Sequence, residues 1–404
     1  MTEQAHDLTA YRAVGGYAGG ADLRAEVAAA GLRGRGGAWF PVELKWLATS
    51  DGAGAPVIVA NGAEDEPGSR KDRHLMAAQP HLVIDGALAS AAAVGADTVR
   101  LYVNTHAAPA LAAIRSALHE VLDAGLAKGV DITVVEAPAS YVAGEDSAAI
   151  EFLENGTAQP RTKPPYPAVA GLHGRPTVVS NVETLAHVAL IARDGAAAFQ
   201  DTMLITLPAE CRNPGVYEVP LGAYLDEVIA EHGGGFVNGP ARGVQVGGPA
   251  SGWLAGDQLH VPLDPDSIKA AGSTLGCGAL RVLPVGHCAV DAITSTSEFF
   301  AREQCGKCPP CRMVTQFIHG VSKALLAGKA AVAQLDTAPT LLAQVRPNTA
   351  CALPTFALPP MTSAREVFAD DFATHLAGEE CGLVHRRQSL RIEDSPGPAE
   401  GDQR

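Results

Sequence analysis

The sequence lacks the two features that would assign it to a membrane or to nucleic acid. No stretch reaches the roughly 18 uninterrupted apolar residues of a membrane-spanning helix. Lysine and arginine total 30 against 44 acidic residues, a formal net charge of −14, and no basic block is longer than residues 385–387. A membrane span is therefore not expected, and nucleic acid and anionic lipid are poor candidates as partners.

A secretion signal is missing as well. Residues 1–7 have neither a basic start nor an apolar core, so we expect no signal peptide. Eight cysteines without such a signal are expected to be reduced thiols in a cytoplasmic protein. Charged residues make up only 18% of the chain, below the roughly 25% of typical soluble domains. That deficit fits either a compositional bias or a surface covered by partner subunits.

Four of the cysteines form a recognisable metal-binding pattern. Cys305, Cys308 and Cys311 are each separated by two residues, and Cys351 follows in Asn-Thr-Ala-Cys-Ala-Leu. Three thiolates on one tight loop and a remote fourth can enclose a cuboidal [4Fe–4S] cluster. A structural zinc ion is the alternative, although its usual pattern is two separated cysteine pairs. Cys211, Cys277, Cys288 and Cys381 occur singly, and we interpret each as a buried structural cysteine.

A glycine-rich loop near the N-terminus is a candidate phosphate site. Gly31, Gly34, Gly36 and Gly37 fall within seven residues, and Arg33, Arg35 and Lys45 supply positive charge. Successive backbone N–H groups in such a loop form an anion-binding nest. A plain flexible loop is an equally good interpretation of the glycines alone.

Residues 1–200 predict a parallel, doubly wound α/β domain. A helical lead-in covers residues 1–30, short apolar strands are expected at 56–60, 98–103 and 132–135, and helices at about 75–95 and 107–127. Polar residues, including Asn61, Glu64 and Glu66, follow the first strand, where open α/β sheets bind ligands.

Two further segments of this domain are expected to begin helices. Gly144 and Glu145 lead into one helix, where a helix cap and a ligand contact are equally good interpretations of the carboxylate. A proline-rich hinge follows at residues 159–167. Residues 177–185 are expected to open another helix, whose free N–H groups can hold a phosphate.

The pattern changes near residue 200. Residues 201–285 predict a small β-grasp-like domain, and residues 286–390 predict a helical bundle with helices at 291–302, 312–328 and 332–345. The cluster cysteines begin between two of these helices. Residues 391–404, rich in proline, glycine and charge, are expected to be a disordered tail.

These motifs together resemble one family. Gly31-Leu-Arg-Gly-Arg-Gly-Gly-Ala-x-Phe-Pro41, Glu64-x-Glu-Pro-Gly68, Gly144-Glu145, Lys163-Pro-Pro-Tyr-Pro167, Asn181-Val-Glu-Thr-Leu185 and the three clustered cysteines occur in order. They resemble the NADH-oxidising flavoprotein of respiratory complex I, the F subunit of NADH:quinone oxidoreductase, and the diaphorase subunits of NAD-linked hydrogenases and formate dehydrogenases. The resemblance extends from about residue 9 to about residue 385.

The resemblance implies a Rossmann-like FMN/NADH domain at 1–200, an SLBB-type β-grasp domain at 201–285 and an iron–sulfur bundle at 286–390. Hydride would pass from NADH to FMN, and single electrons would then pass through one [4Fe–4S] cluster to a partner. The implied partner is a small thioredoxin-like or ferredoxin-like iron–sulfur protein, within complex I or beside a membrane-bound reductase. The implied location is cytoplasmic, with attachment to the cytoplasmic membrane face through partners.

The resemblance also implies roles for individual residues. Glu64 and Glu145 would be the catalytic carboxylates, Glu66 would contact the NADH ribose, and Phe40 and Tyr166 would pack around the adenine. Cys305, Cys308, Cys311 and Cys351 would bind the cluster. The residues expected around FMN and nicotinamide are Gly34, Gly36, Gly37, Lys45, Asn61, Gly144, Glu145, Ser180, Asn181 and Thr184.

The sequence departs from the family pattern inside this pocket. Trp39 and Glu43 stand where the family has glycines, and Ala63 stands where it has an aspartate. Asp146 replaces a glutamate and Ser180 replaces an asparagine. Ala48 occupies the position of a third adenine-packing aromatic residue of the family. An indole can occupy cofactor volume and a carboxylate repels phosphate. An electron-relay protein with impaired NADH or FMN binding, linking a ferredoxin and a membrane reductase, is the second hypothesis. A zinc-bearing scaffold protein is the third.

Overall fold

The computed structural model describes residues 1, 7–19, 22–385 and 390. The chain divides into two compact units: unit 1 comprises Met1–Asp65 and Arg70–Leu204, and unit 2 comprises Glu66–Ser69 and Ile205–Arg404. The predicted domain boundary at 200/201 lies close to this division. The boundary predicted at 285/286 falls inside unit 2 and stays a prediction, and the predicted tail at 391–404 lies outside the described residues.

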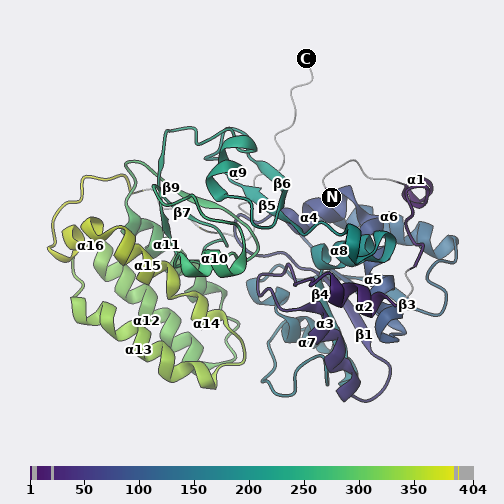
Figure 1. Cartoon of the computed structure of the whole chain (residues 1–404). Helices are drawn as coiled ribbons and strands as arrows, with labels where there is room; N and C mark the ends of the chain where they lie inside the picture. The colour runs from purple at the N-terminus through teal and green to yellow at the C-terminus, as the bar shows by residue number, and fades with distance from the viewer. Residues whose placement is uncertain (2–6, 20–21, 386–389, 391–404) are drawn as a thin grey trace. The chain divides into compact units, whose positions relative to one another are not determined.

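Unit 1 is built on a parallel four-stranded sheet in the order β3-β2-β1-β4 (Figure 1). The strands are β1 (Val57–Gly62), β2 (Thr98–Asn104), β3 (Asp131–Ala137) and β4 (Thr177–Asn181). The first three confirm the predicted strands. The fourth corrects the prediction for residues 177–185, because Thr177–Asn181 is a strand and α8 (Val182–Asp194) begins only after it. Three consecutive buried β-branched residues, Thr177 to Val179, fit a strand covered on both faces better than a first helical turn.

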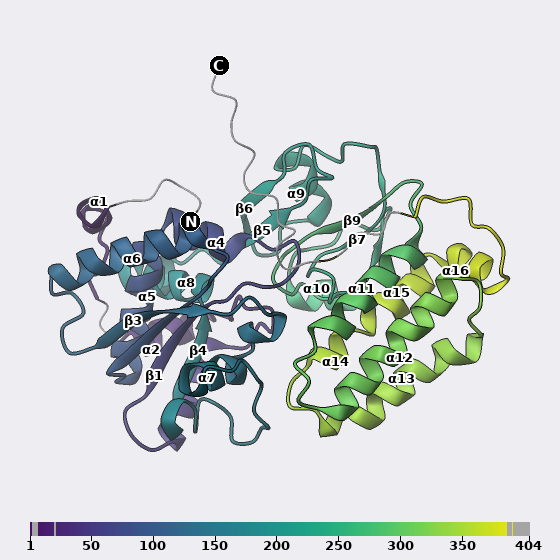
Figure 2. The same cartoon turned by 180° about the vertical axis from the view of Figure 1, so that it is seen from behind.

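Helices cover both faces of this sheet. Val57, Val59 and Tyr102 pack with residues of α7 (Asp146–Asn155) in one core cluster. Because side chains alternate along a strand, the equally buried Ile58 points to the opposite face, where α5 (Pro80–Val94), α6 (Ala108–Asp123) and α8 pack (Figure 2). The remaining helical segments of unit 1 are α1 (Leu8–Ala13), α2 (Leu23–Ala29), α3 (Val42–Leu47), η1 (Ala48–Asp51), α4 (Lys71–Ala78), η2 (Tyr141–Gly144), η3 (Leu172–Gly174) and η4 (Ala196–Ala198).

A single glycine allows α5 and α8 to approach closely. A Cβ atom at Gly86 would lie 1.8 Å from the carbonyl oxygen of Leu185, so only glycine fits at this contact. The helix predicted at 75–95 is in fact two helices, α4 and α5, that meet at Gln79–Pro80. Proline fits at the first position of a helix but removes a hydrogen bond from a helix interior.

Unit 2 contains two small sheets. β5 (Thr202–Leu207), which crosses the division between the units, pairs with β6 (Gly215–Pro220), and β8 (Leu254–Ala255), β7 (Ala241–Gln245) and β9 (Arg281–Pro284) form an antiparallel sheet. Two short helices accompany them, α9 (Leu225–Glu231) and α10 (Pro265–Ala270).

The rest of unit 2 is helical. Helices α11 (Ala289–Glu303), α12 (Pro309–Leu326) and α13 (Val332–Val345) lie side by side in both ribbon views (Figures 1 and 2), close to the three predicted ranges. Shorter helices complete the group: α14 (Leu353–Phe356), α15 (Pro359–Val367) and α16 (Ala369–Leu376), with η5 (Arg346–Asn348) between α13 and α14.

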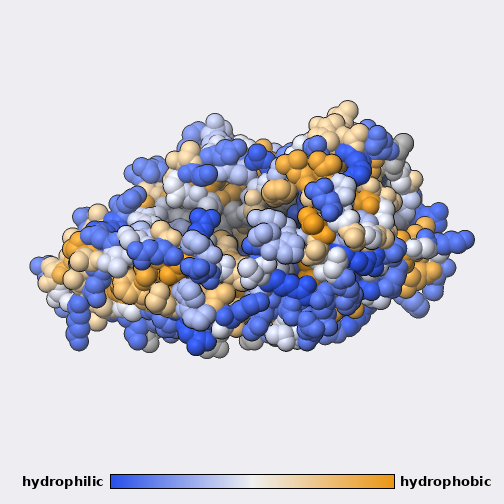
Figure 3. Space-filling model, turned by 90° about the horizontal axis from the view of Figure 1, so that it is seen from below, coloured by the Kyte–Doolittle hydropathy of each residue, from blue (hydrophilic) through white to orange (hydrophobic). Residues whose placement is uncertain are grey.

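Among the helices of the described residues, none is both long and apolar enough to cross a membrane. In the space-filling view, hydrophobic residues occur in small groups between hydrophilic ones (Figure 3). Single exposed apolar residues are ordinary on protein surfaces and need no explanation by themselves.

Candidate functional site

The strand order places the candidate ligand site at the carboxyl ends of β1 and β4. The chain runs from β1 outward to β2 and β3 and then returns to the other side of β1, which makes the β1/β4 junction the topological switch point. Asn61 and Asn181 are register partners at this edge, directly after the pair Ala60 and Ser180. Predicted site residues from two distant segments therefore meet where open α/β sheets bind ligands.

The glycine loop lies against the start of α8. The backbone N–H of Arg35 donates to Oγ1 of Thr184 at 2.8 Å, and a Cβ atom at Gly36 would lie 3.3 Å from Cβ of Asn181. Gly37 has a φ of +98°, a conformation that glycine adopts readily. A backbone bridge between Arg33 and Pro41 closes the loop at its base. The loop and the free N–H groups of a helix start are thus adjacent, an arrangement that suits a phosphate.

The side chains of Arg35 and Trp39, two residues of this loop, are buried in the protein interior. The Arg35 side chain is 1% exposed, and its guanidinium contacts Asp201, the carbonyl oxygens of Thr202 and Arg33, and the ring of Trp39 at 4.6 Å. Its charge is neutralised inside unit 1 rather than offered to a phosphate. Trp39 is 8% exposed, with its indole packed on Arg35 and a φ of +54°.

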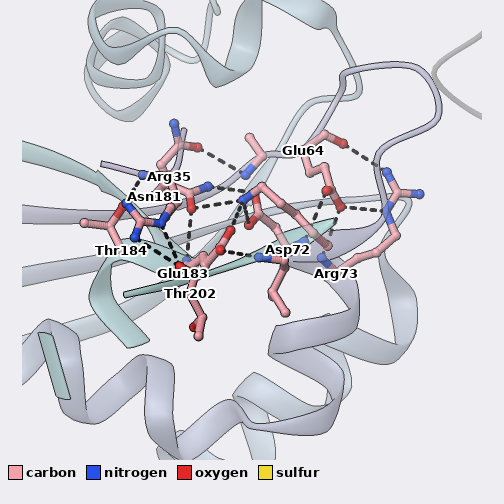
Figure 4. Close-up of polar contacts among 12 residues, drawn as sticks. Arg35, Glu64, Asp72, Arg73, Asn181, Glu183, Thr184 and Thr202 are labelled. Carbon is pink, nitrogen blue, oxygen red and sulfur yellow. Dashed lines mark hydrogen bonds and ion pairs between the residues drawn. The ribbon is translucent and has the colours of Figure 1, made fainter. Parts of the chain in front are cut away.

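A buried ionic network holds Asn181 in place (Figure 4). Lys71, 1% exposed, contacts Glu183 at 2.7 Å and Asp72 at 2.6 Å, and also donates to Oδ1 of Asn181. Asn181 in turn donates to Asp72 and caps α8 by accepting from the N–H of Glu183. Burial works against the Lys71 charge, but the two carboxylates outweigh it and raise its pKa. Lys71 and Asp72 were not predicted as site residues, because a buried lysine has no sequence signature distinct from an exposed one.

Glu64 anchors the start of α4 in the same region (Figure 4). Its carboxylate accepts from the N–H groups of Asp72 and Arg73 and forms an ion pair with the Arg73 side chain at 3.1 Å. The adjacent Asp65 has one oxygen on Asn104 and a second without a hydrogen-bond partner. Burial raises the pKa of Asp65 to about 7.

A second group of predicted residues meets around Gly144. Asn61 donates to the Gly144 carbonyl at 2.8 Å, and a Cβ atom at Gly144 would lie 2.7 Å from the carbonyl oxygen of Ala63. The Glu145 carboxylate caps α7 through the N–H of Ala148 and contacts Lys163 at 2.7 Å. The cap interpretation of Glu145 is therefore confirmed.

Charges near this group shift each other's protonation. Burial raises the pKa of Glu145, and the carboxyl group of Asp146 adds to the effect, whereas Lys163 opposes it. Lys45 donates to the Val179 carbonyl at 2.9 Å, one residue before Ser180. Burial lowers the pKa of Lys45, Asp146 raises it, and Lys163 lowers it further. The charge of Lys45, in α3, thus interacts with the charges of Asp146 and Lys163 near Gly144.

Three predicted residues stand apart from these contacts. Phe40 is 49% exposed and Tyr166 is 61% exposed, so both aromatic faces are available to a ligand. Glu66 belongs to unit 2, where the N–H of Ala250 donates to its carboxylate at 3.3 Å.

The four cluster cysteines come together in unit 2. Gly306, with a φ of +82°, turns the loop between α11 and α12; Cys308 is the residue before α12, and Cys311 lies in its first turn. The N–H of Ala350, beside Cys351, donates to Sγ of Cys308 at 3.4 Å. Burial raises the pKa of the Cys311 thiol to about 12, and the nearby Cys351, Cys308 and Cys305 contribute. Four convergent thiols at a helix start, the positive end of its dipole, fit an anionic iron–sulfur cluster.

A glycine loop at a sheet switch point and a separate set of four cysteines are the features expected of an iron–sulfur flavoprotein. Residues 27–190 match the model of the Nuo51 FMN-binding domain, and residues 291–375 match that of the NADH-ubiquinone oxidoreductase-F iron-sulfur binding region.

The chain is 36% identical over 403 residues to the NADH-quinone oxidoreductase F subunit 2 of Rhizobium meliloti (strain 1021), covering 93% of this chain and 96% of that protein. It is 32% identical to the NADP-reducing hydrogenase subunit HndC of Solidesulfovibrio fructosivorans, covering 87% and 75% respectively. A solved NAD+-reducing [NiFe]-hydrogenase, in the air-oxidized state, matches with a TM-score of 0.79 and 33% identity, covering 88% of this chain. This chain spans 62% of that hydrogenase chain.

The chain belongs to the family of NADH-quinone oxidoreductase F subunits. The predicted family, the cofactors FMN and a [4Fe–4S] cluster with NADH as substrate, and electron transfer from NADH through FMN to the cluster are confirmed.

Proposed function

We propose that this chain is a diaphorase-type subunit in which unit 1 binds FMN and NADH and the cysteines of unit 2 hold the cluster that feeds a partner. The observation that carries the proposal is the meeting of the glycine loop, Asn181 and Thr184 at the β1/β4 switch point. Bound FMN supplies the chemistry, because it accepts an electron pair from NADH and releases electrons singly.

In this proposal the loop of Gly34, Gly36 and Gly37 and the first turn of α8 hold the FMN phosphate. The loop amides and the helix dipole attract the anion, and no bulky side chain blocks close approach of the backbone at these glycines. Ser180 and Thr184 offer hydroxyl groups, and Lys45, with its lowered pKa, offers a poorly solvated cation or a neutral donor.

Asn61, Gly144 and Glu145 are proposed to line the flavin and nicotinamide. The hydrogen bond from Asn61 to the Gly144 carbonyl fixes these two segments to each other before any ligand binds. We propose Glu64 and Glu145 as the carboxylates of the pocket. Both are anchored, Glu64 by Arg73 and Glu145 by Lys163, so each carboxyl group is held in a fixed position in the pocket.

Recognition of the NADH ribose and adenine is proposed for Glu66, Phe40 and Tyr166. A carboxylate accepts from both ribose hydroxyls and repels the 2′-phosphate of NADPH. Exposed aromatic rings offer a stacking surface for the adenine. Replacing Glu66 by Gln is expected to narrow the preference for NADH over NADPH in steady-state kinetics, and an unchanged preference would remove Glu66 from this role.

The electron acceptor is proposed to be a small iron–sulfur protein, and the final acceptor a quinone-type reductase or complex I assembly. Three of the cluster cysteines, Cys305, Cys308 and Cys351, are partly exposed, which leaves the cluster close enough to the surface for transfer to a docked protein. The proposed location is cytoplasmic, with membrane attachment through such partners.

The decisive experiment is a visible spectrum of anaerobically purified protein before and after addition of NADH. Flavin and cluster bands that both bleach support the proposal. A cluster band without flavin, indifferent to NADH but bleached by dithionite, would replace it with the electron-relay function. Neither band, with zinc on the four cysteines, would leave a scaffold protein.

A further inference from the structure

Two cysteines that look isolated in the sequence meet two histidines in unit 2. The ligand atoms of Cys288, His375, Cys381 and His385 all lie within 4.8 Å of one another. Sγ of Cys288 is 3.3 Å from Nε2 of His375, and Sγ of Cys381 is 2.9 Å from Nε2 of His385. Cys288 is buried as predicted, whereas Cys381 is partly exposed, and neither cysteine is isolated in space.

The two printed cysteine–histidine separations, 2.9 Å and 3.3 Å, and the upper limit of 4.8 Å for the set bracket the donor spacing around one tetrahedral metal ion. Zinc binds thiolate sulfur at about 2.3 Å and imidazole nitrogen at about 2.0–2.1 Å, so tetrahedral donors lie about 3.3–3.8 Å apart. Two sulfurs and two nitrogens are a common structural zinc set, and their softness disfavours magnesium and calcium. The set shares no residue with the four cluster cysteines.

The backbone holds the donors in this arrangement without help from a metal. Cys288 is the residue before α11, and His375 lies in the last turn of α16. The segment that carries Cys381 and His385 is hydrogen-bonded to the backbone around Cys288. The N–H of Cys288 donates to the Val384 carbonyl at 3.1 Å, and the N–H of Val384 donates to the Gly286 carbonyl at 2.8 Å. Backbone hydrogen bonds thus join two of the three parts of the chain, and α16 is joined to the start of α11 through the Asp371 carboxylate and the Ala289 N–H.

Outer contacts also support the donors. Asp371 accepts from the N–H of Ala289, next to Cys288, at 2.8 Å, and Arg242 holds the Asp371 carboxylate at 2.7 Å. Contacts of this kind behind the ligand residues usually hold metal ligands in a fixed orientation.

Burial of the four donors is graded. Cys288 and His375 are buried, Cys381 is partly exposed and His385 is exposed. The graded exposure gives an ion an entry path from solvent to a site whose inner half is already rigid.

We propose that Cys288, His375, Cys381 and His385 bind one structural zinc ion, separate from the iron–sulfur cluster. The ion links the segment Glu379–His385 to the start of α11 and the end of α16, two helices of the group that also carries the cluster. With four protein ligands the site is closed, so it stabilises structure and does no chemistry. This proposal does not depend on the proposed NADH activity.

The first test is metal content and zinc-edge X-ray absorption on the full, anaerobically purified holoprotein grown with zinc. We expect one zinc per chain beside the cluster iron, with about two sulfur scatterers near 2.3 Å and two nitrogen scatterers near 2.0 Å. Absence of zinc would overturn the proposal, as would a shell of four sulfurs, which would place zinc on the cluster cysteines.

Variants separate the two metal sites. Cys381→Ser and His385→Asn are expected to weaken zinc retention against a chelator at least about tenfold while leaving iron content and the cluster spectrum intact. The matched control is His287→Asn, a histidine beside Cys288 that is not one of the four donors, and it is expected to keep the zinc. Cys308→Ser should lose iron and keep zinc. Zinc retained in Cys381→Ser, or lost with iron in Cys308→Ser, would overturn the assignment.

Hydrogen exchange of the wild-type holoprotein provides a readout that needs no variant. Removing zinc with a chelator is expected to increase exchange selectively in Glu379–His385, because the ion is proposed to hold that segment. Exchange unchanged in this segment would overturn the structural role. A disulfide between Cys288 and Cys381, detected by mass spectrometry in the anaerobic protein, would also overturn it.

Discussion

At the scale of single residues, Trp39 tests whether the departures from the family pattern obstruct the cofactor pocket. Its indole is buried on Arg35, so Trp39→Gly removes a buried aromatic ring, while glycine relieves the backbone strain of the positive φ. We expect the net effect to be a decrease of about 2–4 kcal/mol in the free energy of unfolding. NADH turnover is expected not to rise. Trp39→Phe, which keeps a ring over Arg35, serves as the control and should lose less stability. A rise in turnover in Trp39→Gly would show that the indole narrows the pocket.

Asp65 predicts a pH dependence of stability. Its folded pKa of about 7 lies above the ordinary 3.8, so the folded state binds the proton more tightly than the unfolded state. The resulting stabilisation is complete below about pH 4 and is lost as the pH rises to about 7. Asp65→Asn removes this dependence, and we expect the variant to be more stable than the wild type at pH 8 by a few kcal/mol, on the order of 1.4 per pKa unit.

Urea denaturation from pH 4 to pH 8 measures this effect. Asp51→Asn, which removes an exposed carboxylate, is the control and is expected to follow the wild type. A variant Asp65→Asn that loses stability with pH as steeply as the wild type would contradict the prediction.

Lys71 is the residue on which the orientation of Asn181 depends. Lys71→Met leaves the carboxylates of Asp72 and Glu183 buried without a cation, and we expect a loss of about 3–5 kcal/mol of unfolding free energy. Flavin retention on purification should fall with it, because Asn181 loses its fixed partner. The exposed Lys128→Met is the control, and equal effects of both changes would refute the network's role.

The candidate site illustrates what single residues reveal in a sequence. The glycines of the loop and the four cluster cysteines could be assigned, because few other residues serve a close backbone approach or an iron–sulfur cluster. The ionic network of Lys71 and the proposed metal ligands around Cys288 could not. In both, the partners are distant in the chain and each residue alone has an ordinary explanation.

At the scale of secondary structure, Gly86 in α5 limits how α5 and α8 pack. Gly86→Ala drives a Cβ atom into the Leu185 carbonyl, and we expect a loss of at least about 1–3 kcal/mol in denaturant unfolding. The control is Gly320→Ala in α12, where a Cβ atom meets nothing within 4 Å, and it is expected to gain about 0.5–1 kcal/mol. Equal effects at both glycines would contradict the close approach.

The errors in element prediction have a common physical cause. Asn181 and Glu183 give a strong helix start, which draws residues 177–181 into the predicted helix, and that start is real but belongs to α8 alone. The other three strands were predictable from continuous apolar runs, whereas a strand joined directly to a helix gives no turn signal between them.

At the scale of the whole molecule, Cys308→Ser tests whether the two units work as successive modules. We expect transfer to a one-electron partner to be abolished, while NADH oxidation with an artificial acceptor for the flavin stays within about twofold of the wild type. The reason is that Cys308 belongs to unit 2 and the proposed flavin contacts belong to unit 1. Cys277→Ser is the control. Loss of both activities in Cys308→Ser would mean that the cluster and flavin sites are not independent.

The organisation of the molecule was predictable only in part. The alternation of strands and helices predicted the parallel sheet, because each apolar strand must be buried on both faces. The assignment of Glu66–Ser69 to unit 2 was not predictable, since those four residues are flanked on both sides by unit 1 and have no composition that sets them apart.

That short segment has a consequence for the newly made chain. Glu66 is the first residue of that segment, and its carboxylate accepts a hydrogen bond from the N–H of Ala250, 184 residues further along the chain. At about 5–20 residues per second, a ribosome needs roughly 10–40 s to reach that partner. During this interval unit 1 can finish its sheet, but the Glu66 carboxylate lacks the Ala250 N–H. The carboxylate proposed to recognise the ribose is therefore fixed in position last, and a chain stalled before residue 250 is expected to carry the sheet of unit 1 with Glu66 not yet held by Ala250.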